Sequence, residues 1–140
     1  MKILLAVDGS EYTRRMLDYV ASHSKTLGEG GDYTTLHAVP PVSQRAAAFF
    51  GTDVARDHYE EEAKEVLAPI RTWLQERGIH ATYVHKVGHP AAEIATLAQE
   101  GGFDLVVMGS HGHNALRSLV LGSVATKVLA ACSVPVLIVR

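Results

Sequence analysis

The chain has 140 residues, of which 47% are hydrophobic and 20% charged, and its formal net charge at pH 7 is −2. This length suits one domain spanning residues 1–140 around one buried core, and it is too short for two ordinary domains. The slightly negative charge gives no basic surface for nucleic acid, and no apolar run approaches the roughly 20 residues of a membrane-spanning helix. With Cys132 as the single cysteine, an internal disulfide is excluded. We therefore expect a soluble, cytoplasmic protein that binds neither nucleic acid nor membranes.

The first half of the sequence predicts two buried strands and two helices. Residues 3–7 form a short apolar run, and apolar residues at helical spacing follow it as far as Leu27. A second strand is predicted at residues 33–39. Pro40 and Pro41 close this strand, and we expect a loop from there through residues 50–52, followed by one long helix that continues through Pro69.

The second half predicts three more strands, at residues 79–87, 105–108 and 136–139. The first of these alternates between apolar and polar residues, as an edge strand does. A helix between the first two begins at Pro90 and stops before Gly101. Another helix begins at Gly122 or Ser123 and carries an apolar stripe up to Cys132, which we interpret as a core residue.

Five strands alternating with four helices predict an α/β fold, a doubly wound parallel sheet with helices on both faces. The apolar strands belong in the centre and the alternating strand at an edge, which favours the order 3-2-1-4-5. In that order the chain reverses direction between the first and fourth strands, where open sheets bind ligands. Asp8, Val39 and Gly109 should therefore lie around one crevice.

The segment after the fourth strand is rich in glycine and has the spacing Gly109, two residues, Gly112, nine residues, Gly122 and Ser123. Glycines permit positive φ angles and let a ligand approach main-chain N–H groups, and a helix N-terminus attracts anions. The segment therefore predicts a phosphate site. It lacks the Gly-Lys-Ser/Thr ending of a P-loop, and Gly9 alone does not make a dinucleotide fingerprint.

This glycine spacing resembles that of the universal stress protein family, in its ATP-binding branch. Residues 3–10, 88–91 and 134–139 are similar to stretches of that family too, so the resemblance extends over the whole chain. It implies ATP as the ligand. Mg²⁺ or Mn²⁺, if present, would come with the triphosphate and be held by its oxygens and by water. It also implies a homodimer and a role in stress adaptation. An unidentified protein partner is a further hypothesis.

The resemblance also implies roles for individual residues. Asp8 would lie near the adenosine, and the backbone of Val39 would meet the adenine edge. The ribose and phosphates would be held by Gly109, Gly112, Gly122 and Ser123. Neighbouring residues expected at the site are Val7, Met108, Ser110, His111, Val124 and Ala125, and Arg117 is a candidate for reaching phosphate.

Several alternatives remain open at this point. Asp8 could serve only the turn before the first helix, where Ser10 can also be the cap. A slow ATPase or phosphotransferase would draw on Ser110, Ser123, His111 or His113, although nothing in the sequence arranges these as a nucleophile and base. A nucleotide-free partner-binding domain is the third hypothesis. The two histidines could also suggest a metal site, but no nearby ligands complete it, and we expect solvated loop residues.

Two apolar segments lie outside the predicted crevice. Phe49 and Phe50 would be either a mobile lid over the ligand or an anchor for their own loop. The last strand, made up of Val136, Leu137, Ile138 and Val139, is apolar on both faces although it should form an open edge. Exposed apolar edges pair with other chains, so we expect the homodimer to form through this strand.

Overall fold

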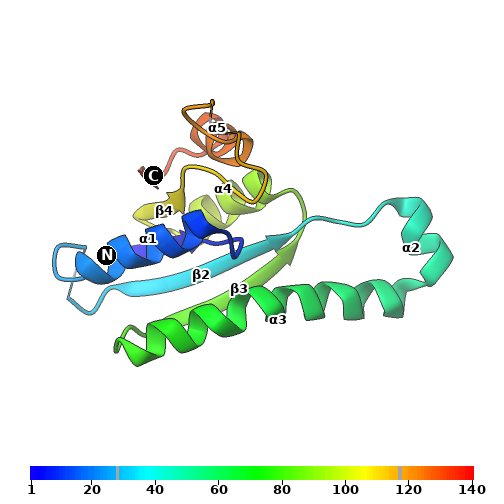
Figure 1. Ribbon diagram of the computed structural model, residues 1–140, viewed down its shortest axis with the longest axis horizontal. Coiled ribbons are helices and arrows are strands. Elements are labelled where there is room, and N and C mark those ends of the chain that lie inside the picture. The colour runs from blue at the N-terminus through cyan, green and yellow to red at the C-terminus, as the bar shows by residue number, and fades with distance from the viewer. Residues whose placement is uncertain (28, 117) are drawn as a thin grey trace.

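The computed structural model describes residues 1–27, 29–116 and 118–140. Its elements in chain order are β1 (Lys2–Ala6), α1 (Glu11–Ser22), β2 (Asp32–Val39), α2 (Gln44–Phe50), α3 (Thr52–Glu76), β3 (Ala81–Val87), α4 (Pro90–Glu100), β4 (Leu105–Gly109), α5 (Ser123–Ala131) and β5 (Val136–Val139) (Figure 1). The five strands form one sheet in the order β3-β2-β1-β4-β5, and all neighbouring strands are parallel. The predicted α/β fold and strand order are thus confirmed.

The position of each strand follows from its pattern of side chains. β1 lies in the middle, where Leu5 pairs with Thr35 of β2 on one side and with Val107 of β4 on the other. Its residues are buried on both faces because helices cover both sides of the sheet. β3 forms one edge, where Thr82, His85, Lys86 and Val87 are exposed and the other three residues are partly buried, so the exposure does not follow the predicted alternation.

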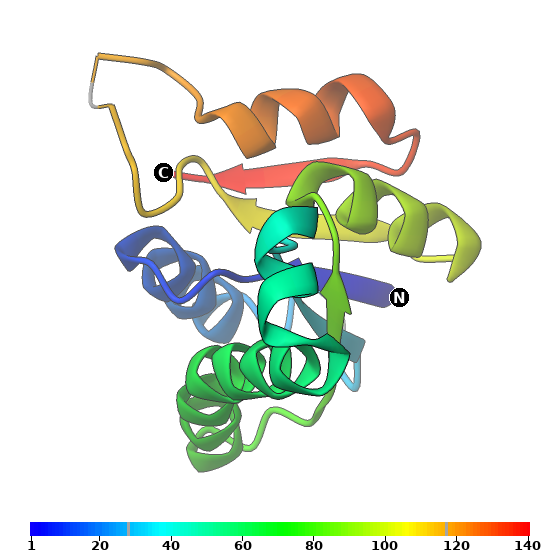
Figure 2. The same cartoon turned by 90° about the vertical axis from the view of Figure 1, so that its right-hand side faces the viewer.

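The helices cover the two faces of the sheet in pairs. α1 and α3 pack on one face, where Met16 and Leu74 belong to one buried cluster with Leu5. α4 and α5 pack on the other face, where Ile94 and Val128 join a second cluster. Figures 1 and 2 show these two layers on either side of the strands. The right-handed crossovers of parallel strands require this arrangement.

A helix, α2, occupies the segment predicted as a loop before residue 50, so the fold has five helices among the described residues rather than four. The Ser43 side chain caps it by accepting a hydrogen bond from Ala46 N. Gly51, with φ of 87°, separates it from α3 because ordinary residues avoid that conformation. α2 lies at the far end of α3, away from the sheet, and Phe49 is 81% exposed (Figure 1).

Two helix ends also differ from the prediction. α1 stops at Ser22 instead of continuing to Leu27, because the chain enters tight turns in which Leu27 N donates to His23 O. Leu27 is still packed against the core. α5 ends at Ala131, so Cys132 is the residue after the helix and is half-buried. Leu129 of the predicted apolar stripe is 46% exposed.

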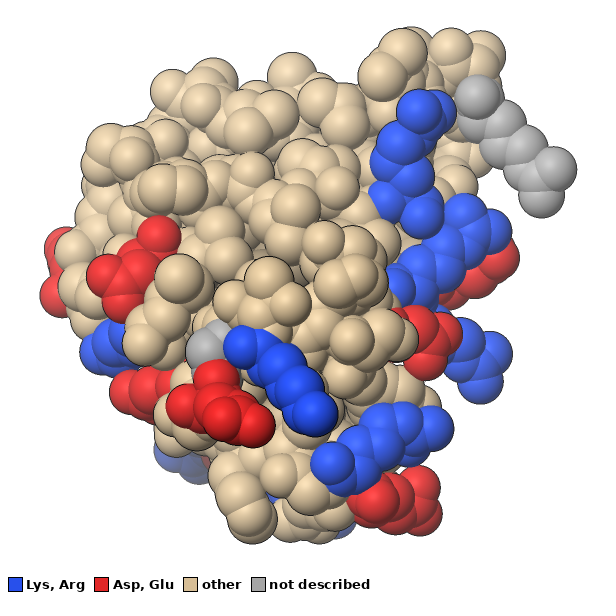
Figure 3. Space-filling view, turned by 90° about the vertical axis from the view of Figure 1, so that its left-hand side faces the viewer, with Lys and Arg blue, Asp and Glu red and all other residues tan. Residues whose placement is uncertain are grey.

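The surface carries charges of both signs. On the face opposite the end where α2 lies, Lys and Arg side chains lie next to Asp and Glu side chains, and much of the rest is uncharged (Figure 3). This mixture agrees with the small net charge of −2. Within the described ranges, no helix combines the length and apolar character needed to cross a membrane.

Candidate functional site

Asp8 follows β1, and one of its carboxylate oxygens accepts hydrogen bonds from the turn that leads into α1. Its Oδ1 accepts hydrogen bonds from Ser10 N and Thr13 Oγ1, each at 2.9 Å. The cap of α1 is Ser10, whose hydroxyl accepts from Thr13 N at 3.4 Å. These bonds fix the side chain of Asp8 and leave Oδ2 facing Gly112.

The segment between β4 and α5 is held by the ring of His111. Its Nε2 lies 2.9 Å from Leu119 O, and because a carbonyl only accepts, Nε2 carries the proton. In the neutral ring, Nδ1 is then an acceptor, and Ser110 Oγ lies 2.9 Å from it. Gly122 N also donates to Ser110 O at 2.7 Å. His111 and Ser110 thus fold the segment back on itself.

The three glycines of the motif, Gly109, Gly112 and Gly122, do not have positive φ angles. Near the motif, a positive φ angle is found instead at Gly9 (79°). An added β-carbon on Gly109 would come within 2.7 Å of Tyr12 Cβ, and one on Gly122 within 3.1 Å of Ser110 O. These two glycines are required because other parts of the chain approach them closely.

The N-terminus of α5 offers unpaired donors. Gly122 is the N-cap with φ of −73° and ψ of 168°, and no described side chain caps the helix. The first N–H groups of a helix have no partner within it, so those of Ser123, Val124 and Ala125 are available. All three residues line a cavity.

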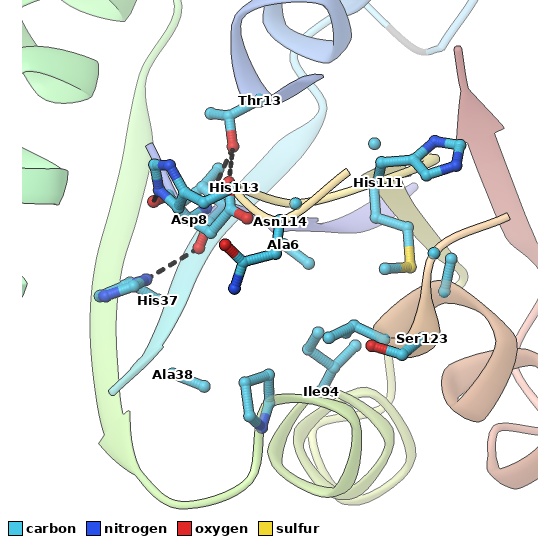
Figure 4. Close-up of a pocket in the computed structure, with 18 of the residues that line it drawn as sticks. Ala6, Asp8, Thr13, His37, Ala38, Ile94, His111, His113, Asn114 and Ser123 are labelled. Carbon is cyan, nitrogen blue, oxygen red and sulfur yellow. Dashed lines mark hydrogen bonds between the residues drawn. The ribbon is translucent and has the colours of Figure 1, made fainter. Parts of the chain in front are cut away.

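This cavity has a volume of about 490 Å³ and opens at the carboxyl ends of the strands (Figure 4). Ten of the twelve predicted site residues line it: Val7, Asp8, Met108, Gly109, His111, Gly112, Gly122, Ser123, Val124 and Ala125. They come from the segment after β1, the end of β4 with the loop that follows it, and the N-terminus of α5, as expected at the point where the strand order reverses.

Val39 and Ser110 are the two predicted residues that do not line the cavity. Val39 is fully buried, and its carbonyl accepts a hydrogen bond from Gly88 N at 2.9 Å. Its neighbours Ala38 and Pro40 line the cavity in its place. Ser110 is 1% exposed and its side chain is bonded to His111.

Two titratable lining residues were not anticipated from the sequence. His37 of β2 is 4% exposed, and its Nδ1 lies 2.9 Å from Val7 O (Figure 4). Among the described residues its Nε2 has no hydrogen-bond partner, and it lies 3.7 Å from Oε1 of Glu62 on α3. A histidine in an otherwise apolar, buried strand end was a signal for His37, whereas Glu62 stood among other acidic residues of an exposed helix face.

The charges of the site come from acids and histidines. Asp8 and Glu62 line the cavity, and among the described residues the lining contains neither lysine nor arginine. Arg117, named as a candidate phosphate ligand, lies outside the described residues. Within the described ranges no three His, Cys, Asp or Glu side chains are grouped to hold a metal ion. An anion here would depend on backbone N–H groups and hydroxyls.

The cavity brings no nucleophile together with a base among the described residues. Ser110 is paired with His111, but its buried hydroxyl does not line the cavity. Ser123 lines the cavity, but no described base is hydrogen-bonded to its hydroxyl. His113 is the second histidine of this segment. Its Nε2 lies 2.7 Å from Asp8 O and donates a hydrogen bond to this carbonyl.

Comparison with known proteins identifies the family of this chain. The family model described as the universal stress protein family matches residues 1–140. The chain belongs to this family. Universal stress protein MJ0577 of Methanocaldococcus jannaschii is 38% identical over 154 residues, covering 99% of this chain and 94% of the relative. Universal stress protein YxiE of Bacillus subtilis is 31% identical over 147 residues, with 99% and 98% covered.

Solved structures of universal stress proteins agree with this fold. The structure of MJ0577 has a TM-score of 0.83 and 32% identity, covering 99% of this chain and 94% of that one. A universal stress protein from Archaeoglobus fulgidus, solved in complex with dAMP, has a TM-score of 0.72 and 24% identity, with 100% and 98% covered. At that identity the second likeness shows the shared fold.

Proposed function

We propose that this universal stress protein binds ATP in the cavity at the carboxyl ends of its strands and acts through its nucleotide-bound state. One observation carries the proposal: a cavity of about 490 Å³ lies between the free oxygen of Asp8 and the unpaired N–H groups that begin α5. Ligand pockets of proteins commonly measure about 300–1,000 Å³, so the volume suits a nucleotide.

The phosphates belong at the N-terminus of α5. Ser123, Val124 and Ala125 present backbone donors there, and the dipole of the helix adds positive potential. The Ser123 hydroxyl supplies one more donor. Such a site recognises the phosphate oxygens without a lysine, which agrees with the absence of a P-loop sequence.

The adenosine belongs between Asp8 and the end of β2. Oδ2 of Asp8 is an acceptor suited to a ribose hydroxyl, and the hydrogen bonds to Oδ1 hold the carboxylate in place. Ala38 and Pro40 form an apolar wall on the β2 side. The solved complex of the Archaeoglobus fulgidus relative with dAMP is in agreement with an adenine nucleotide as ligand.

A metal ion would enter with the nucleotide. Three grouped ligand side chains are missing from the described part of the chain, so Mg²⁺ or Mn²⁺ would be held by phosphate oxygens and water. The residues present fit this arrangement because the cavity leaves the mouth beside α5 open to solvent, where Ser123 is exposed.

In the cell this binding would make the protein a regulatory module of stress adaptation, acting in the cytoplasm as a homodimer. The absence of a paired nucleophile and base among the described lining residues favours binding over turnover. An unidentified protein partner would then read the nucleotide-bound form. Residues 1–140 would act as one nucleotide-binding domain.

Calorimetry with ATP and Mg²⁺ tests the proposal. We expect a 1:1 complex with a dissociation constant in the micromolar range and a higher melting temperature in the presence of ligand. Extraction of the purified protein should also release an adenine nucleotide identifiable by mass. The absence of heat and of any thermal shift at millimolar ATP would overturn the proposal.

A further inference from the structure

His111 lines the cavity, yet both nitrogens of its ring are already bonded to other parts of the chain. Its Nε2 donates to Leu119 O at 2.9 Å, and in the neutral ring Nδ1 accepts from the Ser110 hydroxyl, also at 2.9 Å. A neutral imidazole has one donor and one acceptor nitrogen, so the ring has neither left for a ligand. Any contribution of this side chain to binding therefore goes through the residues that it holds.

The bond to Leu119 joins the two ends of the segment between β4 and α5. His111 follows the end of β4 closely, and Leu119 lies shortly before Gly122, the N-cap of α5. The backbone bond from Gly122 N to Ser110 O, at 2.7 Å, closes the base of this loop. A loop closed by one bond can still swing about it, whereas a second bond fixes the direction of the chain. The ring of His111 supplies this second bond.

The ring is itself held between two helices. The ring of Tyr12 on α1 packs against it with the two centroids 5.1 Å apart. On the α5 side, a β-carbon added to Gly122 would lie 3.1 Å from Cα of His111 and 3.6 Å from Cδ2 of its ring. Figure 4 shows His111 and Ser123 on the same side of the cavity, across from His37. The contacts of the ring therefore act on the end of the cavity where α5 begins.

We propose that His111 is a positioning residue for the phosphates of the bound nucleotide, because its bond to Leu119 O sets the direction in which the first N–H groups of α5 face the cavity. This inference rests on the proposed function. Donors that are fixed before binding need no ordering when the ligand arrives. Loss of the bond should therefore weaken the contacts of the phosphates and spare those of the adenosine, which lies toward Asp8 and β2.

Two substitutions separate the two bonds of the ring. In His111→Gln the amide reaches as far as Nε2 and can still donate to Leu119 O. In His111→Asn the shorter side chain reaches only as far as Nδ1, so it can accept from Ser110 but cannot reach Leu119. His23→Asn is the matched control, because the ring of His23 also stacks on a tyrosine, Tyr19, and bonds to a carbonyl, but lies outside the cavity lining.

The experiment measures the binding of ATP with Mg²⁺ and of adenosine, by calorimetry and, for weak binding, by NMR titration. We expect His111→Asn to lower the affinity for ATP about fivefold and to leave that for adenosine unchanged. His111→Gln should restore most of the ATP affinity, and His23→Asn should alter neither. Thermal unfolding without ligand shows whether the variants fold. If His111→Asn does not, His111→Phe takes its place, since it keeps a ring against Tyr12 but has no nitrogen.

The comparison of the two ligands separates positioning from a merely structural role. An equal loss for ATP and adenosine, an unchanged ATP affinity in His111→Asn, or a loss in His111→Gln as large as in His111→Asn would each overturn the inference. In all three cases, binding of ATP by the unmodified protein would leave the proposed function intact. If the unmodified protein bound neither ligand, the proposed function and this inference would both be overturned.

Discussion

A β-carbon on Gly112 would lie 2.8 Å from Oδ2 of Asp8, so the glycine leaves the room in which this carboxylate oxygen faces the cavity. The two residues are 104 positions apart in the sequence, and they meet because β1 and β4 are neighbours in the sheet. One residue provides the acceptor and the other keeps its surroundings open.

Asp8→Asn should weaken ATP binding about tenfold and lower stability by less than about 1 kcal/mol. The amide oxygen can still accept from Ser10 N and Thr13 Oγ1, but the amide NH2 group then takes the place of Oδ2 and cannot accept a hydrogen bond from a ribose hydroxyl. Calorimetry and thermal unfolding measure the two effects. Asp104→Asn is the control, since Asp104 accepts from Lys2 N before β4, outside the cavity lining. Equal affinity in both variants would place the ligand away from Asp8.

Gly112→Ala should reduce ATP affinity because the added methyl group displaces the carboxylate of Asp8. In a protein that already carries Asp8→Ala, the same glycine substitution should cost little further affinity, because the crowded oxygen is gone. A double-mutant cycle of binding constants gives this coupling. Additive losses would show that Gly112 acts on the ligand directly.

Gly122→Ala should differ from Gly112→Ala by lowering stability as well as affinity. Its added β-carbon would meet the backbone of Ser110 and His111 at 3.1 Å, and backbone atoms yield less easily than the end of a side chain. Thermal unfolding without ligand measures the difference. A melting temperature of Gly122→Ala equal to that of the unmodified protein would contradict this reason.

Ile138→Lys should convert the proposed dimer to a monomer. β5 is an edge strand whose four apolar residues are only half-buried, and a charge on such an edge prevents pairing with another chain. Light scattering gives the mass. Val87→Lys, on the opposite edge strand β3, is the control and should leave the mass unchanged. A dimer that survives in Ile138→Lys would reject the interface.

Tyr33→Phe should make the protein more resistant to alkali. Burial raises the pKa of the Tyr33 hydroxyl above its ordinary value of 10.0, and this hydroxyl has no hydrogen-bond partner among the described residues. A pKa raised on folding makes a contribution to stability that is complete below pH 10 and is lost as the pH rises through the folded value. Unfolding curves between pH 8 and 11 should therefore fall less steeply for the variant, while near neutral pH the change stays within about 1 kcal/mol.

The positions of candidate site residues are easiest to predict from the sequence where the order of the strands alone determines them. Asp8 and Gly109 end two neighbouring parallel strands, so any sheet of this order brings them together. Val39 ends a strand as well, but the hydrogen bond from Gly88 N to its carbonyl continues the ladder toward β3 and keeps this residue buried.

The remaining differences depend on packing that one-dimensional patterns do not contain. Glu62 reaches the cavity only because α3 crosses over the end of β2, and nothing local to its acidic neighbours marks that contact. α2 has no buried residue, so it shows no apolar periodicity by which a helix could be predicted.

The hydrogen bond from His113 Nε2 to Asp8 O joins residues that are 105 positions apart. Contacts of such long range form only after most of the chain is ordered, so partly folded forms of the protein lack this wall of the cavity. A ligand bound there would consequently slow the global unfolding of the chain and protect its central strands from hydrogen exchange, rather than protecting one loop.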